Sequence, residues 1–362
     1  MMRLFGRRQA NPSDHGLYVP TMDGPLRPND HLDRASIVWT GAHIDDLAVL
    51  NDELVFTSEN RLLSLRTEDG EVTLIKAFDR QITALAVAAS GLLAIALFGE
   101  GLRLRSADDQ WQKIALPEKY NACVTALHFD ADDGLYCAIG SNTNPISAWR
   151  RDLFERNAHG EILHVQPAQA KVRSVAGDLH YPAGLVLDGN GDIIVAEAWA
   201  HRVVALSPQG ALKRTLLADL PAYPGRLSVD GEEHYLVSLF APRRQIYEFI
   251  LREPGFLQDM LAKLEEDEWV GPTYGRPRSA NYPLLQGEVR QMGVMKPWAP
   301  SSSCGLVISC DGDFAPLESW HSRADGQMHG ISAALRFGEH MFAASKGNGC
   351  LLMMRAGSGD GH

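Results

Sequence analysis

Short apolar runs alternate with polar, glycine-containing turns along most of this chain of 362 residues. The clearest unit lies at residues 179–206, where apolar runs at 185–187 and 193–196 flank the turn Asp-Gly-Asn-Gly, and a third run follows at 203–206. Two apolar runs across such a turn are typical of a β-hairpin, because Gly and Asn tolerate the positive φ that a tight turn requires. The segment therefore predicts consecutive antiparallel strands of one sheet.

The same pattern of strand, turn and strand occurs six times along the chain. Its aligned first positions are spaced by 38, 42, 58, 42 and 106 residues, at Asp45, Thr83, Thr125, Ala183, Gly225 and Ile331. Repeats of about 40 residues with four strands each are typical of a β-propeller. We predict an all-β, six-bladed β-propeller, in which residues 36–40 supply the fourth strand of the last blade and so remove a sheet edge.

Two of these intervals are longer than one blade needs. The 58-residue interval predicts a helical excursion at residues 148–160. The 106-residue interval predicts a helix in blade five, because apolar residues follow Glu253-Pro254 at helical spacing: Phe256, Leu257, Met260, Leu261 and Leu264. We divide the chain into an N-terminal arm (1–35), the propeller (36–357, with a helical insertion at about 253–297) and a flexible tail (358–362).

Composition and charge restrict the partners. The chain has 45 Asp and Glu against 34 Lys and Arg, a formal net charge of −11, which disfavours nucleic acid and anionic membranes. No apolar run approaches the roughly 20 residues that span a bilayer, and residues 1–14 lack the apolar core of a secretory signal. Five cysteines, an odd number, fit a reducing compartment. We expect a cytoplasmic protein with a small-molecule substrate; the sequence leaves the oligomeric state open.

Several motifs then carry a family resemblance. The segments VAEAWAHRV (195–203) and LPAYPGRLSVDG (220–231), followed by a helical insertion and by CGLVISCDGD (304–313), resemble the strictosidine-synthase-like six-bladed propellers. That group is related more distantly to the gluconolactonase and paraoxonase type. The resemblance extends over residues 45–354 and implies a functional site where the innermost strands begin, at the central channel.

The resemblance also implies which positions would bind calcium, as they do in the calcium-dependent lactonases of the wider superfamily. The first positions of their innermost strands supply a Glu with Asn and Asp ligands, and calcium takes about 6–8 oxygens. This chain has Ala183 and Gly225 at two of these positions and keeps one acid, Asp45. We therefore expect no metal and no cofactor. A calcium-dependent lactonase is the second alternative, with further oxygen ligands from neighbouring residues: Asn142, Asn144 and Asp46.

Strictosidine synthesis itself is not expected. The resemblance implies a catalytic Glu two residues after a His at the start of the last innermost strand. His329 matches that His, but Ile331 occupies the Glu position, and an aliphatic side chain cannot move a proton.

The positions two residues before each first position should rim the channel mouth: His43, Gln81, Cys123, Tyr181, Tyr223 and His329. An imidazole beside a carboxylate relays protons near neutral pH, so we predict His329 and Asp45 as a catalytic acid/base pair across the junction of blades six and one. The other five rim residues and Arg226 are predicted to bind substrate. Alternatively, each His caps a strand end, the tyrosines wall the channel, and Arg226 anchors a neighbouring blade.

These residues predict a small-molecule enzyme. Its reaction would be metal-independent hydrolysis or a lyase step on an ester, lactone or related natural product at the channel mouth. The first alternative is a non-catalytic propeller that binds a ligand or partner through the channel mouth and the helical insertion.

Overall fold

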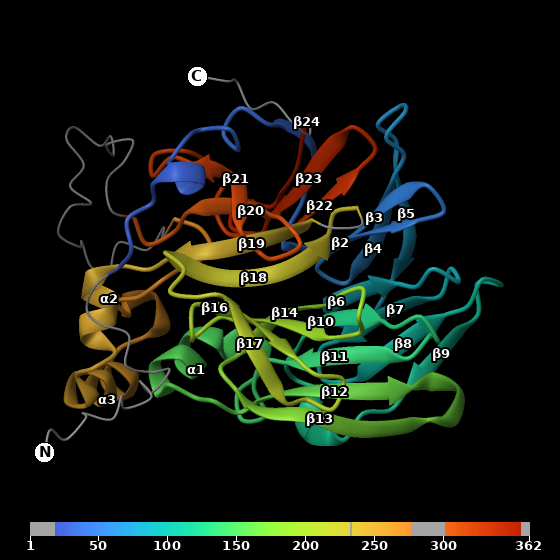
Figure 1. Cartoon of the computed structure of the whole chain (residues 1–362), viewed down its shortest axis with the longest axis horizontal. Helices are drawn as coiled ribbons and strands as arrows, with labels where there is room; N and C mark the ends of the chain where they lie inside the picture. The colour runs from blue at the N-terminus through green and yellow to red at the C-terminus, as the bar shows by residue number, and fades with distance from the viewer. Residues whose placement is uncertain (1–18, 232–233, 277–300, 356–362) are drawn as a thin grey trace, which may run out of the picture.

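The computed structural model describes residues 19–231, 234–276 and 301–355. Within these ranges, six four-stranded antiparallel sheets are arranged in a ring (Figure 1). Each innermost strand contacts the innermost strands of the blades before and after it, and β22 contacts β2, so the ring is closed. The predicted six-bladed β-propeller is confirmed.

Each blade runs outward from the strand that borders the central channel. These innermost strands are β2 (Ile44–Leu50), β6 (Ile82–Val87), β10 (Val124–Phe129), β14 (Pro182–Leu187), β18 (Ala222–Val229) and β22 (Ile331–Phe337). The second strands are β3 (Glu53–Ser58), β7 (Leu93–Leu97), β11 (Leu135–Ile139), β15 (Ile193–Glu197), β19 (Tyr235–Pro242) and β23 (His340–Ser345). The third strands are β4 (Arg61–Leu65), β8 (Gly101–Arg105), β12 (Gly160–Gln166), β16 (Arg202–Leu206), β20 (Gly305–Cys310) and β24 (Cys350–Arg355). The outermost strands are β5 (Val72–Ala77), β9 (Trp111–Ile114), β13 (Lys171–Leu179), β17 (Leu212–Leu217), β21 (Pro316–Ser322) and β1 (Ser36–Thr40).

The N-terminal strand closes the ring as predicted. β1 pairs antiparallel with β24, with Ser36 opposite Met353 and Thr40 opposite Cys350. Blade six is therefore built from both ends of the propeller sequence. This pairing covers an edge of β24 that would otherwise present unpaired backbone groups.

The hairpin at residues 188–192 shows why the repeat folds as it does. Leu187 pairs with Ile193 across the turn, and Gly191 has a φ of +78°, which glycine adopts without steric cost. The side chain of Asp188 accepts hydrogen bonds from the backbone N–H groups of Asn190 (2.8 Å) and Asp192 (2.9 Å). The Asp and Gly positions of the repeat therefore terminate one strand and begin the next.

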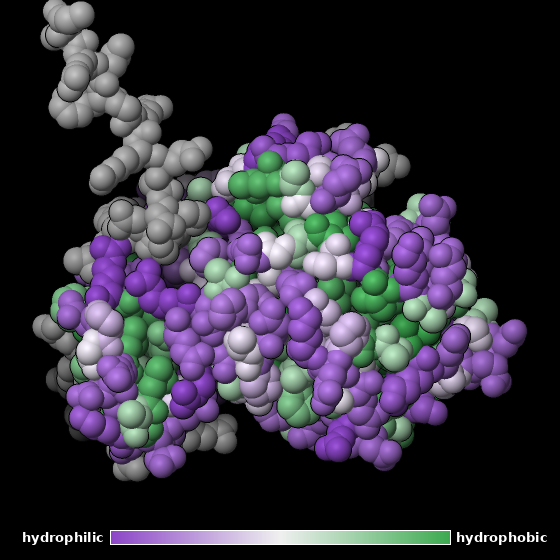
Figure 2. Space-filling view, turned by 90° about the horizontal axis from the view of Figure 1, so that it is seen from below, coloured by the Kyte–Doolittle hydropathy of each residue, from purple (hydrophilic) through white to green (hydrophobic). Residues whose placement is uncertain are grey.

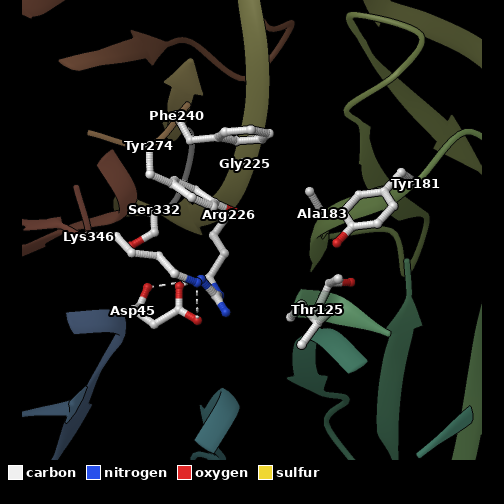
Figure 3. Close-up of a pocket in the computed structure, with 11 residues that line it drawn as sticks. Asp45, Thr125, Tyr181, Ala183, Gly225, Arg226, Phe240, Tyr274, Ser332 and Lys346 are labelled. Carbon is white, nitrogen blue, oxygen red and sulfur yellow. Dashed lines mark hydrogen bonds and ion pairs between the residues drawn. The ribbon is translucent and has the colours of Figure 1, made fainter. Parts of the chain in front are cut away.

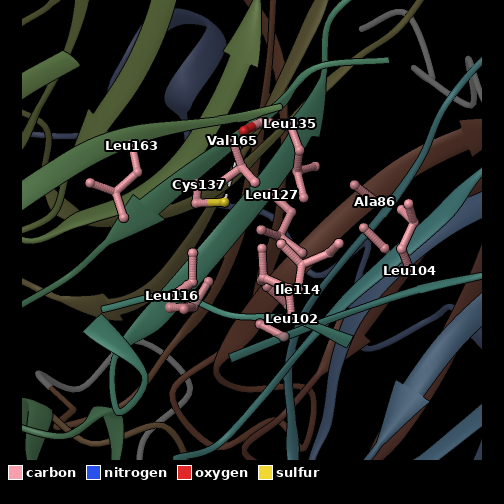
Figure 4. Packing of buried hydrophobic residues seen from close by; sticks show 14 of the residues in the cluster. Ala86, Leu102, Leu104, Ile114, Leu116, Leu127, Leu135, Cys137, Leu163 and Val165 are labelled. Atoms are coloured by element: carbon pink, nitrogen blue, oxygen red, sulfur yellow. Dashed lines mark hydrogen bonds between the residues drawn. The ribbon is translucent and has the colours of Figure 1, made fainter. Parts of the chain in front are cut away.

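The core lies between neighbouring blades. Figure 4 shows one such cluster, in which Leu102 and Leu104 of blade two pack with Leu127 and Leu135 of blade three. Each is at most 9% exposed, and burial of one leucine side chain contributes about 2 kcal/mol. This packing holds the innermost strands in a fixed position around the channel.

Helices interrupt two blades. α1 (Trp149–Glu155) lies between β11 and β12, where the excursion was predicted. Between β19 and β20, inside blade five, lie α2 (Gln245–Ile250), α3 (Pro254–Lys263) and the 3₁₀ turn η5 (Glu266–Glu268). The sequence pattern did not reveal α2. The part of the predicted insertion at 277–297 and the predicted tail at 358–362 lie outside the described residues, as do residues 1–18 of the arm.

The predicted apolar face of α3 is only partly buried. Leu257 and Met260 are buried against Trp269, whereas Phe256 and Leu264 are 48% and 42% exposed. Phe256 lies about 100° around the helix from Leu257, so the two side chains do not share one face. In the view of Figure 2, polar residues cover most of the surface and apolar residues form separate patches. Among the described residues, no helix has the length and apolar character to cross a membrane.

Candidate functional site

A small cavity lies at the end of the channel where the innermost strands begin. Its volume is about 30 Å³. Figure 3 shows a charged group on one side of it and Thr125, Tyr181 and Ala183 on the other. The lining residues are Asp45, Thr125, Ile146, Tyr181, Ala183, Gly225, Arg226, Phe240, Tyr274, Ser332 and Lys346. Four of the six aligned first positions therefore meet here, as the repeat alignment predicts.

Arg226 spans the channel from blade five to blades one and two. Its Nη1 donates to the Asp45 carboxylate and to the Asp45 carbonyl, each at 2.9 Å. Its Nη2 donates to the carbonyl of Thr83 at 2.7 Å, and its Nε lies 3.0 Å from the carboxylate of Asp46. These contacts engage three of the five guanidinium N–H groups in hydrogen bonds, while Nε forms an ion pair with Asp46, so Arg226 connects blades five, one and two.

Lys346 carries the other positive charge of the cavity. It follows β23 directly, and its Nζ lies 3.1 Å from Asp45 Oδ2 and 4.9 Å from the ring centroid of Tyr274. Burial alone would lower the pKa of Lys346, but the carboxylate of Asp45 outweighs burial and raises that pKa, so the ammonium is charged at neutral pH. Because an ammonium has three N–H donors, Lys346 can bind Asp45 and a ligand at the same time.

The two carboxylates beside Arg226 titrate differently. Burial acts to raise the pKa of Asp45, but Arg226 and Lys346 together lower it to about 2. The pKa of Asp46 is raised, mainly because of burial, against the opposing effect of Arg226. Asp45 is therefore ionised throughout the neutral range and is a weak base.

The opposite side of the cavity is aromatic. The ring of Tyr181 stacks on Trp199, with centroids 4.3 Å apart and an interplanar angle of 28°. Tyr274 and Phe240 lie on the charged side instead, above Asp45 and Lys346 in Figure 3; their ring centroids are 5.2 Å apart, and that of Tyr274 lies 4.9 Å from that of Trp149. Burial raises the pKa of Tyr181, so its hydroxyl stays protonated. The cavity thus has an ion-paired ammonium on one side and a phenol on the other.

The predicted acid/base pair is not formed in this structure. His329 is completely buried; its Nδ1 lies 2.7 Å from Ser303 Oγ, and its Nε2 lies 2.9 Å from the carbonyl of Arg323. Since a carbonyl only accepts, Nε2 donates and Nδ1 accepts from the Ser303 hydroxyl. Burial lowers the pKa of His329, which favours the neutral ring. Both nitrogens are therefore occupied, and Asp45 pairs with Arg226 and Lys346 instead.

The remaining predicted rim residues have different surroundings. Only Tyr181 among them lines the cavity. The Sγ of Cys123 lies 3.9 Å from the Tyr181 hydroxyl, behind the cavity lining, and burial raises the pKa of this thiol to about 12. Tyr223 is buried against Trp199, His43 is exposed, and Gln81 is half-buried outside the lining. These positions lie just before the innermost strand or, for Tyr223, at its second residue, where packing between blades decides what each side chain contacts.

Sequence reasoning missed two central residues of the cavity. Lys346 lies in the segment Ser-Lys-Gly-Asn-Gly at the end of the second strand of blade six. The one feature of the sequence that could have indicated this residue is a single Lys in a glycine-containing turn. Tyr274 belongs to the insertion in blade five and has no counterpart in the repeats. Its carbonyl oxygen lies 2.3 Å and 2.4 Å from where a side-chain Cβ would stand at Gly347 and Gly330, so its position requires glycine at both.

These residues do not fit a calcium ion. Asp45 is the one carboxylate of the lining, and Lys346 and Arg226 already neutralise it. Asn142 and Asn144 donate to Glu161 and Asp152. In the part of the chain that the structure describes, no three acidic, His or Cys side chains are grouped to hold a metal. A dication at Asp45 would face an ammonium and a guanidinium, which opposes its binding.

Fold and cavity together define a six-bladed propeller with a small charged cavity at one end of its channel. The family model of the NHL repeat matches residues 179–206, the segment that contains β14, β15 and β16. The chain is distantly related in sequence to the protein STRICTOSIDINE SYNTHASE-LIKE 6 of Arabidopsis thaliana, with 24% identity over 180 residues. This match covers 49% of the chain and 46% of that relative, so the chain spans less than half the length of the curated relative it matches.

Solved structures extend the likeness to nearly the whole fold. A gluconolactonase from Xanthomonas campestris has a TM-score of 0.54 and 16% identity, covering 88% of each chain. Regucalcin from Agrobacterium tumefaciens, described as a calcium-binding protein, has a TM-score of 0.56 and 12% identity, covering 88% of this chain and 92% of its own. At these identities the likeness shows the fold alone. The predicted resemblance to strictosidine-synthase-like and gluconolactonase-type propellers is confirmed.

Proposed function

We propose that this protein is a small-molecule hydrolase of the lactonase type, which opens a lactone or a related ester at the head of the channel and uses Lys346 in place of a metal ion. The observation that carries the proposal is the ion pair of Lys346 with Asp45, at 3.1 Å, in the lining of the cavity. The relatedness to gluconolactonase-type propellers supports the substrate class.

Lys346 supplies the electrophile in this mechanism. A spare N–H of its ammonium donates to the carbonyl oxygen of the substrate and stabilises the negative charge that develops there in the transition state. Asp45 is a positioning residue, because it holds the ammonium in place and keeps it charged, and Arg226 fixes Asp45 in turn. The raised pKa of Lys346 argues against its acting as a nucleophile.

Water is the nucleophile in this mechanism. The cavity volume of about 30 Å³ exceeds the space that one water requires, roughly 10–15 Å³. Water adds to the carbonyl carbon, the bond to the ring oxygen breaks, and Tyr181 is our candidate donor of the proton that this oxygen takes up. The proton lost by the water restores the phenol, so the products are one hydroxy acid and unchanged enzyme. A substrate is larger than the cavity, and its entry requires lining side chains to move.

The test is hydrolysis of a panel of γ- and δ-lactones and aliphatic esters with EDTA present. We expect turnover that the chelator does not change, and a loss of about 10²–10³-fold in kcat for Lys346→Met. The matched control is Lys263→Met, which removes a surface lysine 66% exposed and paired with Asp259. Activity lost with EDTA and restored by calcium would instead support the calcium-dependent lactonase. Full activity in Lys346→Met would refute the proposed role of Lys346.

A non-catalytic binding propeller is the second candidate. It is favoured by the pairing of Asp45 with two cations and by the enclosure of His329, since neither group is an available base. On this alternative, the same lactones bind without turnover. Calorimetry would then show binding to the unmodified protein, loss of that binding in Lys346→Met, and no hydrolysis product.

A further inference from the structure

A second chamber lies on the other side of Arg226. Arg226 lines both this chamber and the cavity of Lys346, and so separates them within one channel. The chamber has a volume of about 260 Å³. All six innermost strands contribute to its wall, including Val49, Val87, His128, Val186, Val229 and Arg336. Val229 is 43% exposed, which shows that the chamber reaches the surface at the end of the channel remote from Lys346.

The innermost strands are sheet edges, so their free backbone groups need partners. At the level of Arg226 the chain supplies them itself. Arg226 donates to the carbonyl of Thr83 (2.7 Å), and the N–H of Leu85 donates to the Asp46 carboxylate (2.8 Å). Farther along, Ser228 Oγ donates to the carbonyl of Ala334 (2.7 Å).

The strand ends that surround the chamber differ from this arrangement. For residues 48–49, 86–87, 127–128 and 186–187, the described part of the chain offers no side-chain hydrogen bond to the backbone edge. These edges present both N–H donors and C=O acceptors to the chamber. A purely hydrocarbon occupant would leave them unsatisfied, at a cost of about 1–3 kcal/mol for each buried group.

The charges around the chamber are balanced. Arg226 is paired with Asp45 and Asp46, and the Arg336 guanidinium lies 3.0 Å from Asp230 and 3.2 Å from Glu318. Burial lowers the pKa of His128 to about 4, so its ring is neutral and offers one donor and one acceptor. An anion or cation entering the chamber would find no unpaired opposite charge among the described lining residues. The wall therefore suits a neutral molecule.

We propose that this chamber is a binding site for one small, neutral, polyhydroxylated molecule of the size of a six-carbon polyol. Hydroxyl groups both donate and accept, so they satisfy the mixed edges of the strands, while C–H groups contact the flanking valine and leucine side chains. A volume of 260 Å³ exceeds the roughly 150 Å³ of a cavity that binds benzene, so a six-membered ring with its hydroxyl groups fits in the chamber. This site is independent of the proposed hydrolysis at Lys346.

The test is calorimetric titration of the full chain with myo-inositol. We expect binding that Val229→Trp, at the surface end of the chamber, weakens at least about tenfold because the larger side chain fills part of the space for the ligand. The matched control is Leu212→Trp on β17, the outermost strand of blade four, where Leu212 is 58% exposed. This variant should bind as the unmodified protein does, and so should Lys346→Met. The charged probe myo-inositol 1-phosphate should bind about tenfold more weakly than inositol, because the chamber offers no unpaired cation.

A second variant and a crystal structure distinguish a loss of ligand binding from a folding defect in Val229→Trp. His128→Phe keeps a planar ring but removes both ring nitrogens that could hydrogen-bond to a ligand, and we expect inositol affinity to fall several-fold, as for the loss of one hydrogen bond. The proposal is overturned if inositol does not bind, if binding is the same in Val229→Trp, or if crystals grown with saturating inositol show only water in the chamber.

Discussion

The ammonium of Lys346 and the carboxylate of Asp45 join blades six and one by an ion pair of 3.1 Å at the head of the channel. The sequence predicts a contact across this junction between Asp45 and His329. In the structure, the partner of Asp45 across this junction is Lys346. His329 contributes to this junction through its backbone, because its carbonyl accepts from Ser345 Oγ (2.7 Å) and from the N–H of Gly347 (3.2 Å), the residues on either side of Lys346.

Asp45→Asn should strongly destabilise the fold. The substitution removes the anion between two cations that are only 11% and 13% exposed, and breaking a buried pair in this way costs about 3–5 kcal/mol. Urea denaturation would measure the free energy of unfolding. The control, Asp259→Asn, breaks an exposed pair on α3 and should cost at most about 1 kcal/mol. Equal losses in the two variants would contradict the importance of the Asp45 pairs.

The contribution of Asp45 to stability should depend on acid pH. Its pKa lies at about 2 in the folded protein, below the ordinary 3.8, because Arg226 and Lys346 outweigh burial. A lowered pKa stabilises the fold above the unfolded value, and this contribution disappears as the pH falls through the folded value. The difference in unfolding free energy between the unmodified protein and Asp45→Asn should therefore be constant above about pH 5 and shrink between pH 4 and pH 2. A difference that already shrinks near neutral pH would contradict the ion pairs.

His329→Ala should act on stability rather than on proton transfer. It leaves the Ser303 hydroxyl and the Arg323 carbonyl without their buried partner, which costs at least about 2 kcal/mol. The exposed His43→Ala is the control and should change the unfolding free energy by less than about 0.5 kcal/mol. The folded fraction of His329→Ala should keep the unmodified pH profile of hydrolysis. A stable but inactive variant with an altered profile would restore His329 as an acid/base residue.

The cysteines should be unreactive in the native protein. Burial raises the pKa of Cys123, Cys304 and Cys310 to about 12 and also raises the pKa of Cys137 and Cys350. Since the thiolate is the reactive form, Ellman's reagent at pH 8 should label these five thiols only after denaturation. Rapid labelling of Cys123 in the folded protein would show an accessible thiolate beside Tyr181. It would contradict the burial of this thiol behind the cavity lining.

The repeats made the architecture predictable, because strand, turn and strand are local patterns with local causes. Asp188 and Gly191 illustrate this, since one accepts backbone hydrogen bonds and the other adopts a positive φ within a single hairpin. The alignment of first positions also brought Asp45, Thr125 and Ala183 to one cavity. The helix α2 was not predicted, because its six residues are too few to show a helical period.

The chemistry of the cavity was harder to predict, because it depends on which side chain of each turn reaches the channel. Tyr181 and Tyr223 occupy equivalent positions before a proline, yet only Tyr181 lines the cavity, while Tyr223 is enclosed beside Trp199 and His201. Lys346 and Tyr274 lie outside the aligned positions altogether. The contacts of Lys346 with Asp45 and with Tyr274 depend on the approach of separate segments around Gly330 and Gly347.

The sequence by itself determined six blades, their order, the closure of the ring by residues 36–40 and the end of the channel where polar residues gather. These follow from hydrophobic periodicity and turn residues, which act over a few positions. Only the tertiary structure decided that Arg226 divides the channel, that Lys346 rather than His329 pairs with Asp45, and that the second chamber is left with unpartnered strand edges. Those outcomes depend on distances of a few ångströms between residues more than one hundred positions apart, and such distances are set by the packing of whole blades.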